Sequence, residues 1–280
     1  MKISVLLLVI IFLIVQAGYS QNFSAGQVLD AETGDPIPYV NIGITKRMAG
    51  TVSDENGVFR LKYNSEGDLI TISAIGYEIH EITVRDLLND DSIYMTPTMY
   101  EIEEIIVEER ALGGIKNLGY KLDNRGESVG FGSTQLGTEI GGLIEIDRET
   151  IIYQAFFTVN RTTDEELLFR VNLYEFENGE SKRNLIPENV LVAAPEEPGT
   201  FSVNLTKYNI VTEKDVMLSL EWVKAVSLEQ DEIQGLAFRA DKTRRNPNAY
   251  FRSTSHAPML SMEQFIKYNL GFYLAVRQVR

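Results

Sequence analysis

Two histidines, His80 and His256, are the only ones in the chain, and cysteine is absent. A zinc peptidase site needs a His-x-x-Glu pair and a distant third ligand, and neither histidine has that spacing. A Ser-His-Asp triad would need one of the same histidines, and no G-x-S-x-G motif is present. Ser253 and Ser255 lie near His256 only along the chain. The sequence therefore predicts no metal site, no cofactor and no nucleophilic catalyst.

Carboxylates offer the remaining route to catalysis. Two acids at a defined separation are enough for glycoside hydrolysis, and the chain has 40 Asp and Glu residues. Four candidates lie in the second half, namely Asp147, Glu149, Glu165 and Glu175. Acidic solvent-facing surfaces explain these residues at least as well. We predict a protein that is not an enzyme, with a carboxylate-dependent hydrolase as the alternative.

Two turns place oxygen ligands beside a glycine, Asp54-Glu55-Asn56-Gly57 and the segment from Asp30 to Gly34. Neither follows the D-x-[DN]-x-[DN]-G calcium loop with its late Glu. Their aspartates are better explained as acceptors for backbone N–H groups of the turns. We therefore predict no calcium site at either turn.

Ligand contact through aromatic side chains has two candidates. Trp222 shares one face of its predicted strand with Leu218 and Leu220, so core packing is the expectation for the indole. The segment Tyr250-Phe251-Arg252 lies in the basic C-terminal region and is the more accessible candidate. From residue 239 to 280, eight Lys or Arg stand against two acids, a difference of +6, which suits contact with the acidic remainder or an acidic partner.

The start of the chain predicts export. Met1-Lys2 precedes an apolar run over residues 3–15, and small residues follow at 16–20. The run is too short to span a membrane comfortably, so residues 1–20 are predicted to be a signal peptide rather than an anchor. The formal net charge of −14 over 280 residues disfavours nucleic acids and anionic membrane surfaces as partners.

Residues 21–96 predict a small antiparallel β-sandwich. Apolar residues alternate with polar or small ones at 26–29, 39–44, 51–52, 58–61, 69–72 and 79–84, with turn residues between them. This unit resembles the carboxypeptidase regulatory-like domain family over residues 23–96. The resemblance rests on Gly26, Val28, Asp30, Thr33-Gly34, Pro36-Ile37-Pro38, Val40, Ile42, Gly50-Thr51, Asp54, Gly57, Phe59, Leu61, Ser73, Gly76 and Tyr77.

The resemblance implies a seven-stranded, transthyretin-like β-sandwich without catalytic residues of its own. It also implies an exported protein of a Gram-negative bacterium, because the family often precedes TonB-dependent transporters. Residues 97–126 are predicted to be an acidic linker, and 113–132 an exposed connection. Within the linker, Glu101 to Glu108 resembles the segment that contacts TonB in those transporters; an edge strand with acidic residues is the simpler interpretation.

Residues 127–280 again predict strands, at 150–159, 166–174, 201–205, 216–223, 236–239, 249–252 and 271–279, with short helices at most at 213–215 and 228–233. This half is loosely similar to jelly-roll accessory domains of secreted proteins. We therefore expect an all-β chain, a transthyretin-like sandwich followed by a larger jelly-roll-like sandwich.

The expected function is a non-catalytic binding or interaction protein of the cell envelope, in the periplasm or at the outer membrane or cell surface. Glycan binding by the second sandwich is its sharper form. A hydrolase in the second domain and a partner of a TonB-dependent transporter are the alternatives. No residue of a ligand site can be assigned from the sequence.

Overall fold

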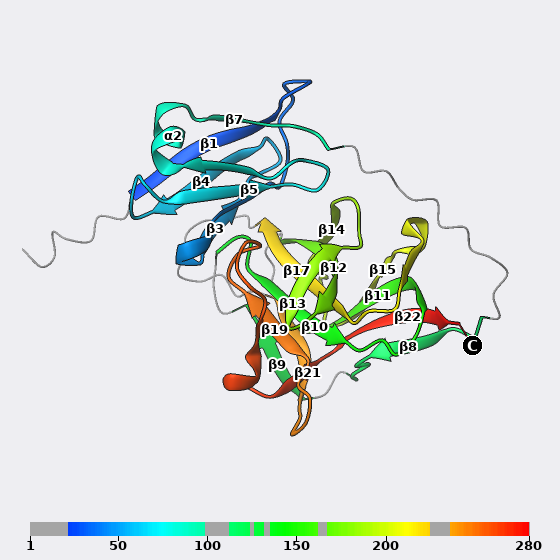
Figure 1. Cartoon of the computed structure of the whole chain (residues 1–280). Helices are drawn as coiled ribbons and strands as arrows, with labels where there is room; N and C mark the ends of the chain where they lie inside the picture. Colours follow the sequence, from blue (N-terminus) through cyan, green and yellow to red (C-terminus); the bar gives the residue numbers. More distant parts are fainter. Residues whose placement is uncertain are drawn as a thin grey trace, which may run out of the picture.

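The computed structural model describes residues 22–98, 112–123, 126–131, 135–161, 167–224 and 236–279. These residues form two β units, with the first above the second in Figure 1. Four predictions concern residues outside this described part: the signal peptide at 1–20, the TonB-like segment at 101–108, Glu165, and the short helix at 228–233.

The first unit is a sandwich of two sheets. One sheet has the order β4-β1-β7, and the other β3-β2-β5-β6. Their bounds are β1 Asn22–Asp30, β2 Asn41–Ile44, β3 Ala49–Val52, β4 Val58–Tyr63, β5 Leu69–Ser73, β6 His80–Thr83 and β7 Ser92–Met95, with a 3-10 turn η1 at Thr45–Arg47. Thirteen apolar side chains, among them Val28, Leu61 and Ile72, form one core between the sheets. The predicted sandwich of seven strands is confirmed for these residues.

Two details differ from the sequence prediction. The strand expected over 79–84 ends at Thr83, where the helix α2 (Val84–Asn89) begins. Thr83 and Asp86 form a capping box, in which each side chain accepts a hydrogen bond from the other residue's backbone N–H, and this box starts the helix. The helix returns the chain so that β7 pairs with β1 in parallel, whereas an antiparallel sandwich was expected.

The second unit is a larger sandwich in which every strand pair is antiparallel among the described residues. The first sheet has the order β13-β12-β17-β10-β19-β20, with β14 beside β12. Its bounds are β10 Glu139–Ile144, β12 Leu168–Glu177, β13 Glu180–Asn184, β14 Val190–Ala193, β17 Val216–Lys224, β19 Ala249–Arg252 and β20 Leu260–Ser261.

The opposing sheet has the order β21-β18-β11-β22-β8, with β15 and β16 beside β11 and β9 beside β18. Its bounds are β8 Lys116–Gly119, β9 Glu127–Gly130, β11 Thr150–Arg161, β15 Gly199–Asn204, β16 Ile210–Thr212, β18 Ala237–Lys242, β21 Tyr268–Leu270 and β22 Phe272–Gln278; the 3-10 turns are η2 Thr206–Tyr208 and η3 Met262–Gln264.

The chain passes back and forth between these two sheets. The strands β10, β12, β17 and β19 belong to one sheet, and β11, β15, β18 and β22, which alternate with them along the chain, belong to the other. This alternation is the winding expected of a jelly-roll-like sandwich. Phe157, Phe169, Trp222, Phe238 and Phe272 fill the space between the sheets. The all-β fold class predicted from the sequence is therefore confirmed.

The stretch over 113–132 was predicted to be an exposed connection, and this is wrong in part. The strand β8 pairs with β22, and β9 pairs with β18. Both strands are short and polar, so their amphipathic period is too weak to see in the sequence. The domain boundaries at 96 and 126 stay predictions.

Candidate functional site

A row of four charged side chains crosses the outer face of the sheet that contains β12. Arg170 on β12 lies opposite Glu221 on β17, Glu221 opposite Glu139 on β10, and Glu139 opposite Arg252 on β19. All four side chains are buried. Successive side chains along a strand point to opposite faces of the sheet. The four charged residues therefore lie on the face opposite the one that packs into the core. We call these residues the charge row.

One end of the charge row is covered by the first unit. Arg170 Nη1 donates to Glu221 Oε2 at 2.9 Å, and Arg170 Nη2 donates to the carbonyl oxygen of Tyr39. The carboxamide oxygen of Asn41 accepts from Arg170 Nη1 at 2.9 Å, and its nitrogen donates to Glu221 Oε1 at 2.6 Å. Backbone and side chain of the first unit thus add partners to a buried ion pair in the second, while Arg170 Nε stays without a hydrogen bond.

The other end is satisfied within the second unit. Glu139 accepts from Arg252 Nε at 2.6 Å and from the Ser219 hydroxyl. Arg252 also donates to the Tyr174 hydroxyl at 2.7 Å and to the Ser255 carbonyl at 2.8 Å. Burial raises the pKa of the Tyr174 phenol well above its usual range, so the hydroxyl stays protonated. A buried ion pair is tolerated when such additional hydrogen bonds satisfy the remaining donors and acceptors.

Asn172 connects the two halves of the row. Its Nδ2 donates to Glu139 Oε1 at 3.1 Å and to Glu221 Oε2 at 3.3 Å, so the two carboxylates share one amide. Burial, together with the neighbouring charge of Glu139, raises the pKa of the Glu221 carboxyl, and Arg170 acts in the opposite direction. The side-chain oxygen of Asn172 accepts from Asn184 on β13 at 3.0 Å.

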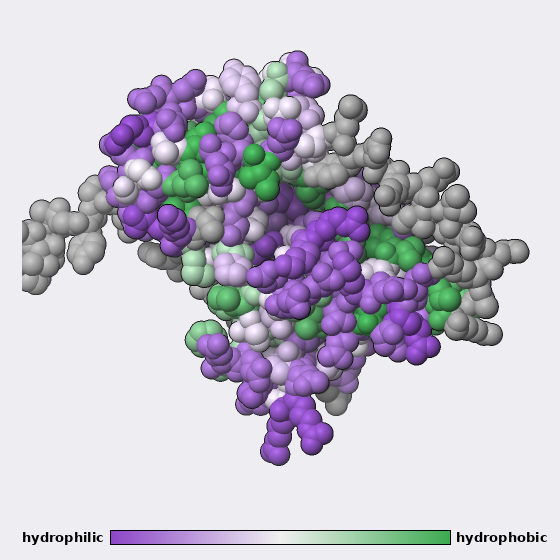
Figure 2. Space-filling model, viewed as in Figure 1, coloured by the Kyte–Doolittle hydropathy of each residue, from purple (hydrophilic) through white to green (hydrophobic). Residues whose placement is uncertain are grey.

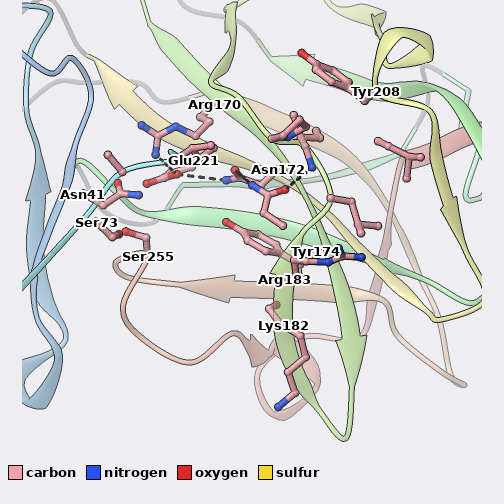
Figure 3. A pocket seen from close by; sticks show the side chains of 18 of the residues that line it. Asn41, Ser73, Arg170, Asn172, Tyr174, Lys182, Arg183, Tyr208, Glu221 and Ser255 are labelled. Carbon is pink, nitrogen blue, oxygen red and sulfur yellow. Dashed lines mark hydrogen bonds and ion pairs between the residues drawn. The ribbon is translucent and has the colours of Figure 1, made fainter. Parts of the chain in front are cut away.

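A pocket of about 980 Å³ opens beside the charge row, between the two units. The first unit contributes Asn41 and the bend at 73–79, and the second contributes β12, β13 and the segments at 185–187 and 208–211. Figure 3 shows Asn41 and Ser73 on one side, Arg170, Asn172 and Glu221 across the floor, and Tyr208 on the far side. The floor is polar and the walls are partly apolar, with Tyr77, Ile79 and Ile186 among the lining residues.

Comparison with known proteins places the first unit in a family. Residues 24–107 match the family model of the CarboxypepD_reg-like domain. The first unit is a CarboxypepD_reg-like domain. The resemblance predicted for residues 23–96 is thereby confirmed.

The CarboxypepD_reg-like domain also carries the likeness to a named relative. The TonB-dependent receptor SusC of Bacteroides thetaiotaomicron is 31% identical over 88 residues, which are 31% of this chain and 9% of the receptor. Among solved structures, the cysteine protease and lectin-like domains of Cwp84 from Clostridium difficile match with a TM-score of 0.38 and 9% identity, over 51% of this chain and 32% of that one. A similarity at this level carries no argument about function.

The two histidines lie apart. His80 lies on β6 of the CarboxypepD_reg-like domain, whereas His256 lies between the two units, with Nε2 at 3.5 Å from both the Asn41 carbonyl and the Ser73 hydroxyl. Burial lowers the pKa of His256, so the ring is neutral at neutral pH. Among the described residues, no three His, Asp or Glu side chains are grouped as a metal site would require.

Three of the four acids proposed as catalytic candidates, Asp147, Glu149 and Glu175, lie in the described part of the chain. Asp147 pairs with Arg148 and accepts from Gln278, and Glu175 pairs with Arg183 and Lys214. Glu149 precedes β11, and its carbonyl accepts from the backbone of Val279. None of these three lines the pocket. Glu139 and Glu221, which share the Asn172 amide, are instead a close pair of acids, and neither was among the candidates.

The two turn aspartates bind backbone, as expected from turn chemistry. Asp30 Oδ1 accepts from the N–H groups of Glu32 at 2.8 Å and Thr33 at 3.0 Å. Asp54 Oδ1 accepts from Asn56 at 2.9 Å and Val58 at 2.8 Å. These contacts hold the carboxylate oxygens in the turns.

Trp222 is buried in the core as predicted, with its Nε1 bonded to the Lys224 carbonyl. The expectation of an accessible Tyr250-Phe251-Arg252 platform is wrong for Arg252, which is buried in the charge row. Tyr250 packs edge-on against Phe176. No helix in the described part of the chain is both long and apolar enough to cross a membrane.

The pocket residues on β12 were missed because their strand looks like an ordinary half-exposed one. In L-F-R-V-N-L-Y, Arg170, Asn172 and Tyr174 alternate with core residues, which normally indicates a solvent-facing side. A signal was available in the predicted strand at 216–223, where Ser219 and Glu221 alternate with Leu218, Leu220 and Trp222. One of these long strands has a positive outward face and the other a negative one, which is consistent with the two strands being neighbours. Sequence alone does not give the register between them.

Proposed function

We propose that this chain is a non-catalytic, exported binding protein of the bacterial cell envelope that takes a glycan in the pocket between its two units. The observation that carries the proposal is the pocket floor. Arg170, Asn172 and Glu221 are held there in fixed positions by buried hydrogen bonds. Planar polar groups held rigidly, beside tyrosines on the walls, suit a ligand with hydroxyl groups on its edges and apolar C–H faces.

The non-catalytic part of the proposal is supported by how the acids are held. Glu139 and Glu221 are each bonded to an arginine and to Asn172, so their oxygens are occupied by fixed donors. A general acid would need an oxygen directed at the ligand. Of the two carboxylates only Glu221 lines the pocket.

Envelope location is supported by the CarboxypepD_reg-like domain and by the likeness to a TonB-dependent receptor. A TonB-linked transporter is accordingly a candidate partner. Deletion of residues 101–108 should release the protein from envelope fractions if this segment mediates that contact, and unchanged fractionation would count against it.

Calorimetric titration with maltohexaose, cellohexaose, xylohexaose and laminarihexaose tests glycan binding. Replacing Tyr208 with Ala should weaken the binding of the responding hexasaccharide about tenfold by removing a wall of the pocket. The exposed Tyr94 on β7 does not line the pocket, so Tyr94→Ala is the matched control. Absence of heat with all four sugars, together with recovery of no protein partner by pull-down, would refute the proposal.

A carboxylate-dependent hydrolase is the second candidate, because Glu139 and Glu221 lie close enough to share the Asn172 amide. The raised pKa of Glu221 fits a proton donor. Chromatography of the same hexasaccharides after long incubation distinguishes the two. Shortened products would favour the hydrolase if Glu221→Gln abolishes them while its circular dichroism spectrum stays that of the folded wild type.

A further inference from the structure

The CarboxypepD_reg-like domain presents a fixed, partly apolar bend to the pocket. Residues 74–79 connect β5 to β6, and Ala74, Ile75, Tyr77 and Ile79 line the pocket. Ile79 is 69% exposed, the second-highest exposure among the large apolar side chains of the described residues. An apolar side chain left in water at the edge of a pocket is a candidate ligand contact.

This bend is held rigidly. Tyr77 donates from its hydroxyl to Asp30 at 2.9 Å, and its backbone N–H donates to the Ala74 carbonyl. The Gly76 carbonyl accepts from Thr98, and Glu78 N–H donates to Thr96. Gly76 has a φ of +89°, a left-handed conformation that glycine adopts without strain. A wall fixed in this way loses little conformational entropy when a ligand binds.

The bend reaches the pocket only because the two units are closely docked. Gly43 on β2 and Gly50 on β3 lie directly opposite each other. A Cβ at Gly43 would lie 2.8 Å from His256 Cδ2, and a Cβ at Gly50 would lie 2.8 Å from Thr254 Cγ2. The missing side chains leave a gap in the sheet surface that residues 254–256 of the second unit occupy.

Other contacts join the same surfaces. The Ser253 hydroxyl donates to the Met48 carbonyl at 3.0 Å, and Lys224 pairs with Glu55 at 3.3 Å. Together with the bonds from Arg170 to Tyr39 and Asn41, these contacts run along one side of the domain from residue 39 to 55. Figure 2 shows a hollow between the two units, with hydrophobic atoms on the upper side and hydrophilic atoms below.

We propose that the bend at 74–79 is a wall of the glycan site, so that the CarboxypepD_reg-like domain takes part in ligand binding and the saccharide binds only to the docked form. This inference rests on the proposed function and adds the source of the second wall. The polar edge of the sugar lies over the floor of the pocket, and its apolar face meets Ile79 and Tyr77. Ligand binding therefore favours docking of the two units, because the undocked chain has only half of the site.

The test uses the full chain and two variants. Ile79→Ala removes the exposed wall contact without touching a core, and it should weaken the binding of the responding hexasaccharide about threefold to tenfold. Its control is Leu88→Ala on α2, which removes another exposed apolar side chain away from the pocket. The three atoms nearest to a Cβ at Gly43 all belong to His256 of the other unit, so Gly43→Val should weaken binding at least about tenfold while separating the units.

Gly67→Val is the control for Gly43→Val, because a Cβ at Gly67 meets only the Ser65 hydroxyl at 3.8 Å. Small-angle X-ray scattering reports whether the two units stay docked. If Gly43→Val remains docked, the affinity of Ile79→Ala alone tests the role of the bend. Wild-type affinity in Ile79→Ala, or in an undocked Gly43→Val, would overturn the inference and leave the proposed function intact. Failure of the wild type to bind any of the four hexasaccharides would overturn both.

Discussion

Glu139 and Glu221 lie directly opposite each other on β10 and β17, both fully buried, although their side chains carry like charge. Like charges in opposite positions are destabilising in a sheet. The arrangement is stable because an arginine lies on the outer side of each acid and the Asn172 amide lies between them. The charge row therefore sets two arginines against two acids, and each member depends on its neighbours.

Substitution of Glu139 by Gln should be strongly destabilising. It leaves the Arg252 guanidinium buried without its carboxylate, and breaking a buried ion pair in this way costs about 3–5 kcal/mol. Urea denaturation followed by circular dichroism measures the loss in free energy of unfolding. A loss below about 1 kcal/mol would show that Arg252 is compensated by other groups.

The double variant Glu139→Gln with Arg252→Met is the control for that measurement. Removing both charges should cost clearly less than the sum of the two single losses, because the second substitution no longer strands a charge. Additive losses would contradict the idea that the two residues act as a pair.

The strands that carry the charge row were easier to predict from the sequence than the row itself. The long strands at 166–174 and 216–223 were expected, and the inward position of Leu218, Leu220 and Trp222 was correct. The strand β10 between β17 and β19 was not expected. It reads E-I-G-G-L-I, and two adjacent glycines are unusual in a strand.

The glycines of β10 have a packing reason that no local pattern carries. A Cβ at Gly141 would lie 2.7 Å from Met217 Sδ, and one at Gly142 would lie 3.2 Å from Phe272 Cβ. The two positions are therefore small because of neighbours far away in the sequence. The pocket has the same origin, since it depends on how the first unit docks on the second.

Gly57→Ala should destabilise the CarboxypepD_reg-like domain. Gly57 has a φ of +72°, and a Cβ there would lie 2.5 Å from the Val28 carbonyl oxygen. Strain and collision together should cost about 2–3 kcal/mol. Gly34→Ala, with a φ of +76° but open space around the new methyl, isolates the strain and should cost about 1 kcal/mol. Thermal unfolding of both variants measures the difference, and equal losses would exclude a steric contribution at Gly57.

Arg239→Met should loosen the segment that leads into β9. The buried guanidinium donates to the carbonyls of Asp123, Glu127 and Ala240. Hydrogen bonds from a charged donor contribute about 1.5–3 kcal/mol each, so the free energy of unfolding should fall by at least about 3 kcal/mol. Limited proteolysis should also cleave the variant near residue 123, where the wild type resists cleavage. Arg239→Lys keeps the charge but not the branched donors and should be intermediate; wild-type resistance in Arg239→Met would refute this role.

Docking of the two units should depend on pH through His256. Burial lowers the pKa of the ring in the docked form, with Arg252 acting in the same direction and the Asn41 carbonyl and Glu81 opposing it. The undocked form has the ordinary value of about 6.5, so it binds the proton first as the pH falls. Docking is therefore unaffected above about pH 7 and weakens as the pH falls from about 6.5 toward the lowered pKa. Small-angle X-ray scattering at about pH 7.5 and 5.5 should show a larger radius of gyration at the lower pH, and His256→Gln should remove the difference. Equal radii in the wild type at both pH values would mean that protonation of His256 does not oppose docking.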